Sequence, residues 1–374
     1  MATRTPKASI RITRRQFVAK VAALGTLPEI AMKTAAGAPV GDFGSKARLL
    51  RRPLLEGAEP VELLQELVRC ATLAANGHNT QPWKFELAPG RISIRPDFSR
   101  RTPVVDPDDH HVWVSLGCAT ENLVIAAAAL GKHADVQFGP QEIRVTLDDG
   151  PSVASPLVNA IFERQCTRAD YDGQPLAGDV LRDLQHAAAR SGVNLLLLTE
   201  RSKFEAVIEY VTQANSAQMR DPAFVAELKH WIRFDDSQAA VTGDGLAARS
   251  SGGPTLPPWI GGPLFSLLFR EKSENERYAR QLRSSAAVAV FAGVRSAPTS
   301  WFDVGRAYEH FALVATSLGV RTAFVNQPIE VPAVRSPFAA WLGIGSQRPD
   351  LLVRLGHGPL LPYSMRRPVV AVTA

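Results

Sequence analysis

Two stretches that lie far apart in the chain repeat one pattern. Residues 117–131 and 305–319 each begin with Gly-x-Ala-x-Glu and each end with Leu-Gly at the same spacing. Both stretches are rich in alanine and other apolar residues, as long buried helices are. Small residues on two helices allow a close approach, so the repeat predicts duplicated halves whose helices pack across a pseudo-twofold axis. Chance similarity between two alanine-rich helices is the alternative.

The segments around these two helices alternate in type. A helix is expected from Pro60, a hairpin from 83–87 and 91–95 around Pro89-Gly90, and an edge-like strand at 143–147. Further on, strands are expected at 193–199, 288–294 and 322–326, with helices near 179–190, 204–218 and 224–232 and closing segments at 351–355 and 368–372. The pattern predicts an α+β protein whose duplicated α/β halves, residues 39–150 and 151–374, form a pseudo-dimer. The chain would act as a monomer, with its two halves in the places of the two subunits of a dimer.

The charge of the chain is concentrated at one end. The 374 residues carry a net charge of +6, and residues 1–38 hold seven basic residues and one acidic residue, which accounts for all of it. The remainder is balanced, with 35 residues of each sign. A nucleic-acid-binding surface on the folded part is therefore not supported.

Residues 1–38 have the layout of an export signal. Arg14-Arg15 stands two positions before Phe17, an apolar stretch follows at 21–30, and small residues occupy 36–38. This segment resembles a twin-arginine signal, which predicts an exported, periplasmic protein that meets the twin-arginine export machinery. The apolar stretch is too short to be a transmembrane segment. A basic tail without a role, on a cytoplasmic protein, is the alternative.

Two residue groups invite a metal or disulfide interpretation. Cys70, Cys118 and Cys166 are scattered and form neither a disulfide framework nor a paired metal motif. The run 108–111 (Asp-Asp-His-His) could be drawn as a metal site. Acidic residues at the start of a helix satisfy the helix dipole without an ion, so we expect no metal site.

The chemistry is expected at an amide-rich turn. Residues 74–83 read Ala-Ala-Asn-Gly-His-Asn-Thr-Gln-Pro-Trp, between a helix and a strand. Gly77 permits unusual backbone angles and Pro82 fixes the exit from the turn. Asn and Gln side chains each donate and accept hydrogen bonds, which suits the edge of a heteroaromatic ring. On its residue types alone, the turn is better explained as a polar loop whose Trp83 fills the core, and it is the rest of the chain that favours a binding site.

Three motifs together resemble the nitroreductase family of FMN flavoproteins. Residues 79–83 are similar to its Asn-x-Gln-Pro-Trp turn, and residues 164–168 (Arg-Gln-Cys-Thr-Arg) to its Arg-x-Ser-x-Arg opening, with Cys166 in the place of Ser. Residues 364–368 (Ser-Met-Arg-Arg-Pro) resemble its closing arginine motif. The likeness covers most of residues 60–372 and is closest to the Acg-like branch, which implies a nitroreductase-like fold.

The resemblance implies one FMN per chain, since each motif occurs once. In the family, one subunit supplies the arginines and its partner the amide turn; here both lie in one chain. Arg164, Arg168 and Arg366 or Arg367 would hold the phosphate, and Arg164 would also stabilise the reduced ring. No catalytic side chain is expected, because flavin N5 carries the chemistry. The cofactor-binding residues implied are Arg164, Thr167, Arg168, Asn76, Gly77, Asn79, Gln81, Gln327, Arg366 and Arg367.

The function implied is an FMN-dependent oxidoreductase. It would pass a hydride from NAD(P)H or another small-molecule donor to a nitroaromatic, a quinone or an unknown electrophile. Residues 235–272, with Gly, Ser and Pro flanking an apolar run, are either a lid over the flavin or a disordered loop. A lidded FMN-binding or sequestering protein with little turnover is the alternative. A pseudo-dimer that has lost FMN is a third, weaker option.

Overall fold

The computed structural model describes residues 42–190 and 192–374. The expected export signal, residues 1–38, lies outside these described residues. For description we call residues 42–150 the first half and residues 151–374 the second half.

The first half is built on one antiparallel sheet. Its elements are α3 (Asp42–Leu49), α4 (Pro60–Thr72), β1 (Trp83–Ala88), β2 (Arg91–Pro96), α5 (His110–Ala129), β3 (Lys132–Phe138) and β4 (Ile143–Asp149), with 3₁₀ turns at Gly77–Asn79 and Phe98–Arg100. The sheet has the strand order β1-β2-β4-β3. β1 and β2 form the expected hairpin, in which Trp83 pairs with Pro96 and Ala88 with Arg91.

The second half contains a second four-stranded sheet and more helices. Its elements are α6 (Pro156–Glu163), α7 (Gly178–Ala187), β5 (Val193–Leu198), α8 (Arg201–Arg220), α9 (Pro222–Trp231), β6 (Ile232–Arg233), α10 (Asp236–Thr242), β7 (Leu246–Ala247), a 3₁₀ turn (Arg249–Ser251), α11 (Pro258–Leu268), α12 (Glu271–Arg283), β8 (Ala287–Gly293), α13 (Pro298–Ser317), β9 (Arg321–Phe324), α14 (Gln327–Glu330), α15 (Pro332–Leu342), β10 (Pro349–Gly356) and a closing 3₁₀ turn (Val369–Ala371). The order of the larger sheet is β5-β8-β10-β9.

The two large sheets have the same topology. In each, two strands come first, a 20-residue helix follows, and the last two strands complete the order first-second-fourth-third. All neighbouring strands in both sheets are antiparallel. The long helices are α5 and α13, which carry the repeated sequence pattern. The predicted α+β fold with duplicated halves is thus confirmed.

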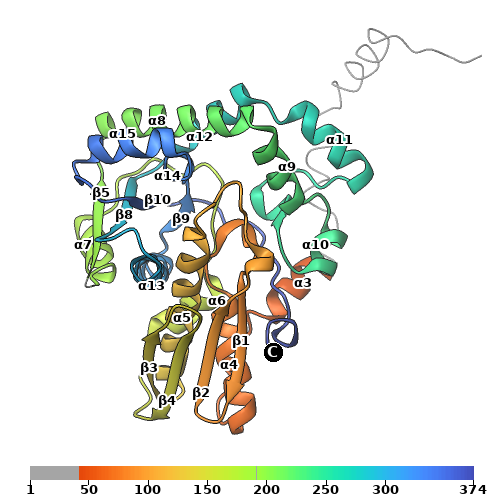
Figure 1. The fold of residues 1–374 in the computed structure, drawn as a ribbon, viewed down its shortest axis with the longest axis vertical. Coiled ribbons are helices and arrows are strands. Elements are labelled where there is room, and N and C mark those ends of the chain that lie inside the picture. The colour runs from red at the N-terminus through yellow and green to blue at the C-terminus, as the bar shows by residue number, and fades with distance from the viewer. Residues whose placement is uncertain (1–41, 191) are drawn as a thin grey trace, which may run out of the picture. The chain divides into compact units, whose positions relative to one another are not determined.

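The repeated glycines form the contact between α5 and α13, which lie side by side (Figure 1). A Cβ added at Gly117 would overlap the carbonyl oxygen of Phe302, and one added at Gly305 would overlap the carbonyl oxygen of Val114. Each glycine therefore meets the backbone three residues before its counterpart, which is the reciprocal contact of a twofold interface. The close approach requires glycine at both positions.

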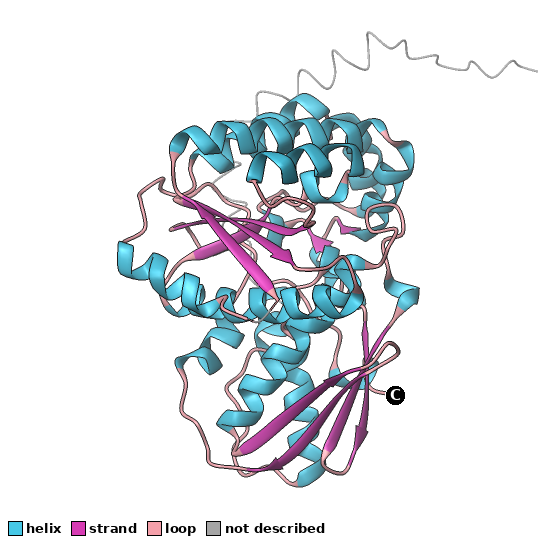
Figure 2. Cartoon of the chain, turned by 60° about the vertical axis from the view of Figure 1, so that its left-hand side comes forward, coloured by secondary structure: helices cyan, strands magenta, loops and turns pink. Residues whose placement is uncertain are grey.

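The two sheets differ in how they are covered. Along β1 and β4 buried and exposed residues alternate, as in a sheet with one face on the core. Every residue of β8 and β10 is buried. One face of this second sheet packs into the core shared with α5 and α13, and the other packs under α8, α12, α14 and α15 (Figure 2).

The C-terminal segment crosses back to the first half. Phe85 of β1 donates its N–H to Val372 O at 2.8 Å and accepts from Ala374 N at 2.9 Å, so the end of the chain lies beside β1 (Figure 1). Met365 packs with Phe43 and Ala47 of α3 in a small separate core. Residues of the C-terminus thereby reach the turn that follows α4.

Several sequence predictions need correction. Strand β3 was not expected, and β4 is an inner strand rather than an edge strand because β3 covers it. The closing segment 368–372 forms a 3₁₀ turn. The interpretation of the three cysteines needs no correction: all lie within the described residues and are free.

Two further findings concern possible partners. Among the described helices, only α5 is long and apolar enough to cross a membrane, and 78% of its apolar window is buried inside the protein.

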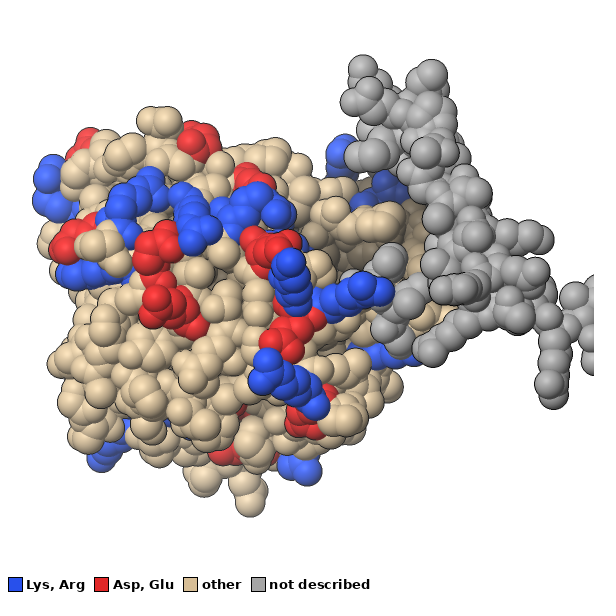
Figure 3. All heavy atoms as spheres, turned by 90° about the horizontal axis from the view of Figure 1, so that it is seen from above, with Lys and Arg blue, Asp and Glu red and all other residues tan. Residues whose placement is uncertain are grey.

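Figure 3 shows basic and acidic side chains interleaved on one face. Ion pairs join α8 and α12: Arg220 with Glu271 and Arg283 with Glu205, each with a nitrogen–oxygen distance of 2.7 Å.

Candidate functional site

A cavity of about 760 Å³, open on one side, is lined by elements of both halves. The first half contributes the turn after α4 and the first two turns of α5. The second half contributes the segment after α6, parts of α8, α9, α11 and α12, and the β9–α14 junction. The volume is within the range of about 300–1,000 Å³ typical of ligand pockets.

The turn that follows α4 has an unusual backbone. His78, Asn79 and Gln81 have φ values of 49°, 53° and 54°, a region that side chains with a Cβ rarely occupy. Asn76 stabilises the turn by accepting a hydrogen bond from Gln81 N at 2.9 Å. Strain of this kind persists where surrounding structure enforces it and is frequent at functional sites.

Four of the ten predicted cofactor residues line the cavity: Asn76, Gly77, Arg168 and Gln327. The Asn76 amide is already engaged, since it donates to Ala74 O and accepts from Gln81 N. Arg168 is different, because its guanidinium has no hydrogen-bond or ion-pair partner within the described residues, although its carbonyl accepts from Gln281. The Oε1 atom of Gln327 is buried and without a partner in the same part of the chain.

Asn79, Gln81 and Arg366 do not line the cavity but form a buried network. Asn79 Nδ2 donates to Gly245 O (3.0 Å) and Met365 O (3.1 Å), and its Oδ1 accepts from Arg366 Nη1 at 2.8 Å. Arg366 also donates to the carbonyls at the end of α4, from Thr72 to Ala74. Burial, followed by the nearby Arg51 and Arg164, holds the pKa of Arg366 well below its ordinary value.

Gln81 and Arg367 extend this network. Gln81 Nε2 donates to Gly243 O at 2.8 Å, and its Oε1 accepts from Arg367 N at 2.8 Å. The Arg367 side chain turns to the carbonyl of Ala371. In this structure the polar atoms of these amides and arginines join the turn, the C-terminal segment and the 243–245 loop. Their role toward a cofactor stays a prediction.

Arg164 and Thr167 also lie behind the cavity wall. Arg164 Nε lies 2.9 Å from Glu309 Oε1, and its Nη2 donates to Leu73 O at 2.8 Å. Burial lowers the pKa of Arg164, but the Glu309 carboxylate together with Tyr308 and two nearby cysteines outweighs it, and the pKa is raised above the ordinary value. Thr167 is fully buried and donates its N–H to Thr322 O of β9. The two arginines of one motif thus have different environments, and only Arg168 reaches the cavity.

Sequence reasoning missed a polar group on the opposite part of the wall. His111 Nε2 lies 3.5 Å from Glu330 Oε1, and Glu330 accepts from Gln218 Nε2 at 2.7 Å. Burial lowers the pKa of the neighbouring His78 to about 4. The only sequence signal for this group was the histidine pair at the start of α5, which was assigned to the helix terminus.

The segment 235–272 supplies one side of the cavity. Residues 251–254 and 256 and part of α11, including Gly261 and Phe265, line it. Gly261 lets α11 lie on Phe234, since an added Cβ would come within 2.6 Å of that ring. Phe265 stacks on Phe269 with ring centroids 4.4 Å apart. The segment therefore has ordered elements that cover the cavity; whether it opens stays a prediction.

The sequence comparisons concern the class of protein. No protein-family model matches the chain. It is similar to the Putative NAD(P)H nitroreductase Rv3131 of Mycobacterium tuberculosis, with 26% identity over 82% of this chain and 89% of that protein. It is also similar to the Putative NAD(P)H nitroreductase acg of the same organism, with 22% identity over 82% and 94% of the two chains. These relatives support the resemblance to the nitroreductase family, and they extend over both halves.

Solved structures give lower similarity. A nitroreductase with bound FMN from Bacteroides fragilis matches 55% of this chain and 90% of its own, with 16% identity and a TM-score of 0.34. A structure from Anabaena variabilis, described as a putative nitroreductase, matches 84% of this chain and 91% of its own, with 11% identity and a TM-score of 0.46.

Proposed function

We propose that this protein is an FMN-dependent oxidoreductase of the nitroreductase type. It would move a hydride from NAD(P)H or another donor to a nitroaromatic, a quinone or another electrophile. The observation that carries the proposal is the cavity, in which Asn76 and Gly77 meet Arg168 and Gln327 from distant parts of the chain. The relatives over 82% of the chain support the same class.

The residues at the wall fit a flavin nucleotide. Arg168 is a cation without a partner in the described residues, which suits a phosphate. Gln327 offers a buried oxygen without a donor, which suits a ring N–H or a sugar hydroxyl. Apolar side chains such as Phe324, Leu264 and Phe265 supply the flat surfaces that an aromatic ring packs on.

FMN, when bound, supplies two-electron hydride chemistry at its N5 atom. The chain's own residues bind and orient. Arg168 would hold the phosphate, Gln327 would accept a hydrogen bond, and the rigid turn at Asn76 and Gly77 would fix the position of the ligand. The apolar wall of α9 and α11 excludes water, which strengthens the polar contacts inside the cavity.

A second candidate function is the binding of FMN with little turnover. The observation that favours it is the cover formed by 251–256 and α11, which occupies one side of the cavity. If this cover stays closed, a flavin would be held while a bulky nucleotide donor would be kept out.

The binding part of the proposal is tested with Arg168→Ala. Losing one charge-assisted contact should weaken FMN binding about 10- to 100-fold, the equivalent of about 1.5–3 kcal/mol. The matched control is Arg91→Ala, an exposed arginine of the β1–β2 hairpin away from the cavity. FMN dissociation constants from flavin fluorescence quenching give the readout. Equal affinity of Arg168→Ala and the control would remove Arg168 from the site.

The two functions are separated by anaerobic mixing of the FMN-loaded protein with NADPH or NADH, followed by a nitroaromatic or a quinone. Rapid bleaching of the flavin and reoxidation by the acceptor are expected for the oxidoreductase. Bleaching by dithionite but by neither nucleotide would favour sequestration or another donor. A protein that retains no FMN at all would overturn both.

We also propose that residues 1–38 direct export, supported by the Arg14-Arg15 pair and its sequence context. Replacing both arginines with lysine should keep the protein in the cytoplasm, because the twin-arginine route depends on the pair. Cell fractionation of the two versions measures this. Equal distribution of the two versions would exclude that route.

A further inference from the structure

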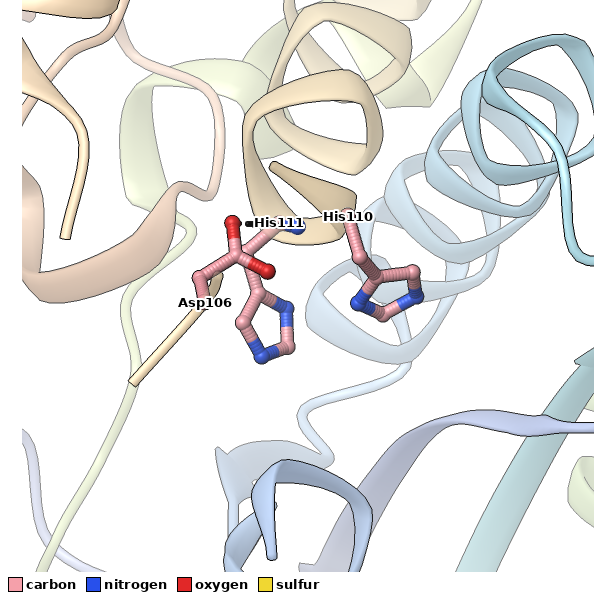
Figure 4. Close-up of side chains that lie close together, drawn as sticks. All are labelled: Asp106, His110 and His111. Carbon is pink, nitrogen blue, oxygen red and sulfur yellow. Dashed lines mark hydrogen bonds between the residues drawn. The ribbon is translucent and has the colours of Figure 1, made fainter. Parts of the chain in front are cut away.

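Three potential metal ligands, none of them among the residues proposed for FMN, meet at the start of α5 beside the same cavity. Asp106, His110 and His111 each offer a ligand atom, and these atoms all lie within 4.8 Å of one another. Figure 4 shows the Asp106 carboxylate beside the two imidazole rings, whose centroids are 4.6 Å apart. We propose that these three residues bind a divalent transition-metal ion, with Zn²⁺ as the ion whose chemistry they fit.

His110 is oriented as metal-bound histidines are. It is fully buried, and its Nε2 lies 3.0 Å from Asp350 Oδ1. Asp350 is itself fixed by Gly293 N at 2.6 Å. The Nδ1 atom of His110 is buried without a partner in the described residues. A carboxylate on one ring nitrogen and a free second nitrogen form the carboxylate–histidine–metal arrangement.

His111 repeats the arrangement with a different carboxylate. Its Nε2 faces Glu330 Oε1 at 3.5 Å, and Gln218 holds Glu330 from the other side at 2.7 Å. This leaves Nδ1 of His111 for an ion. Asp106 Oδ2 accepts from His111 N at 2.9 Å, and the backbone of Val112 also hydrogen-bonds this carboxylate, which fixes it beside the two rings. A carboxylate oxygen can bind an ion while it accepts a hydrogen bond.

The charges around the group are mixed. Arg348, 3.9 Å from Asp350, and the N-terminus of α5 both disfavour a cation. The carboxylates of Asp106, Asp350 and Glu330 offset them, and Arg348 is also paired with Asp108. The carboxylates considered in the sequence, Asp108 and Asp109, are not part of the site, since they face Arg348 and Arg101.

Geometry and access fit a zinc-type ion. Atoms bound to one tetrahedral ion at about 2.0–2.2 Å lie about 3.3–3.6 Å apart, so the three ligands must close by roughly 1 Å. His111 lines the cavity, which gives the ion an entry path and leaves a fourth position for water. Two imidazoles and one carboxylate suit Zn²⁺ better than Mg²⁺ or Ca²⁺, which prefer oxygen ligands.

The test uses the full chain, freed of metal with a chelator, and Co²⁺ as the spectroscopic probe. The wild type should take up one Co²⁺ per chain with the visible bands of a tetrahedral site, and Zn²⁺ should displace it. Asp106→Asn and His111→Gln should weaken binding more than about 100-fold, and Asp350→Asn about 10-fold. Asp109→Asn, on the same turn but outside the site, is the matched control and should bind as the wild type does.

Folding is monitored separately, because the residues are buried. Asp106→Asn retains an oxygen that can accept from His111 N, so it is expected to fold. Zn²⁺ should raise the melting temperature of the wild type and of Asp109→Asn, but not of Asp106→Asn. Absence of Co²⁺ bands in the wild type would overturn the proposal. Bands of equal strength in Asp106→Asn and His111→Gln would also overturn it, since other histidines would then hold the ion.

Discussion

The two sheets share a strand order, yet only the second has both faces buried. β1 and β4 alternate between core and solvent, while β8 and β10 are buried throughout. The difference arises from insertions: α8 follows the first strand of the second sheet, α12 precedes the second, and α14 and α15 precede the last. The second half therefore has a helical layer that the first half lacks. Part of that layer forms one wall of the cavity.

The helix pair between the sheets shows the same divergence on a smaller scale. Glu121 and Glu309 occupy equivalent positions of the repeat. Glu309 is fully buried, faces Arg164 and accepts from Ala75 N in the turn beside the cavity. Glu121 is buried as well, but it pairs with Arg306 Nε (2.8 Å) and His310 Nδ1 (3.0 Å), side chains that are themselves partly exposed. The glycine contact is shared by both copies, whereas the turn and its network are built on one side only.

The largest effect is expected where the two halves are alike. Gly117→Ala and Gly305→Ala each place a Cβ on a backbone carbonyl of the partner helix. A backbone clash in the core cannot be relieved by a side-chain rotation, so each substitution should cost more than about 5 kcal/mol and prevent stable folding. Soluble yield and urea denaturation measure the loss.

Gly178→Ala is the matched control, because an added Cβ there meets only the end of the Arg182 side chain at 3.6 Å. It should be neutral or slightly stabilising, since alanine favours a helix. The comparison would break if Gly117→Ala and Gly305→Ala differed greatly from each other, because the contact is reciprocal. The comparison would also fail if both variants unfolded at the same urea concentration as Gly178→Ala.

The second-largest effect should differ between the two repeated helices, because their equivalent glutamates have different partners. Arg164→Ala leaves the buried Glu309 carboxylate without its ion-pair partner and Leu73 O with only the longer contact from Arg366, which should cost about 3–4 kcal/mol. Arg306→Ala leaves Glu121 paired with His310 and removes a side chain that is itself partly exposed, so it should cost less, about 1 kcal/mol. Urea denaturation midpoints of the two variants near neutral pH give the difference.

The Arg164→Ala variant carries a pH signature as well. Burial already raises the pKa of Glu309, and loss of Arg164 would raise it further. A carboxyl whose folded pKa lies above its unfolded value gives stability that is lost as the pH rises, so the variant should be relatively more stable in acid. Equal costs for Arg164→Ala and Arg306→Ala at all pH values would mean that the two glutamates are equivalent.

The fold was largely predictable because its main signal is local. The repeat in α5 and α13 and the hairpin of β1 and β2 are both visible in residue patterns. β3 was missed because its residues, such as Lys132, His133 and Asp135, are mostly polar; it is formed by pairing with β4, which no local pattern shows. The edge position predicted for β4 was wrong for the same reason.

The site was predictable only in part. The amide turn and the arginine motif were found, but residue types do not show which polar atoms the protein itself uses. Asn79 and Gln81 are taken by carbonyls of residues 243–245 and by the C-terminal segment, far along the chain. Arg164 and Arg168 stand four positions apart, yet Arg164 is engaged by Glu309 and by Leu73 O, both distant in the chain, whereas Arg168 faces the cavity.

The smallest effect concerns Glu121 alone. Burial raises the pKa of this carboxyl, but the hydrogen bond from His310 and the Arg306 guanidinium outweigh it and hold the pKa below its ordinary value. A folded-state pKa below the unfolded value gives stability that is present above the unfolded pKa and is lost as the pH falls. Glu121→Gln should therefore cost at most about 1 kcal/mol near neutral pH, and the cost should shrink as the pH falls below the unfolded pKa of about 4.3 and disappear only below the lower folded pKa. Urea midpoints at a series of pH values measure it, with Glu142→Gln, whose carboxylate pairs with Arg144 on the exposed sheet, as the reference. A cost that grows in acid would place Glu121 in the same class as Glu309, and the difference between the two copies of the helix pair would lose its electrostatic basis.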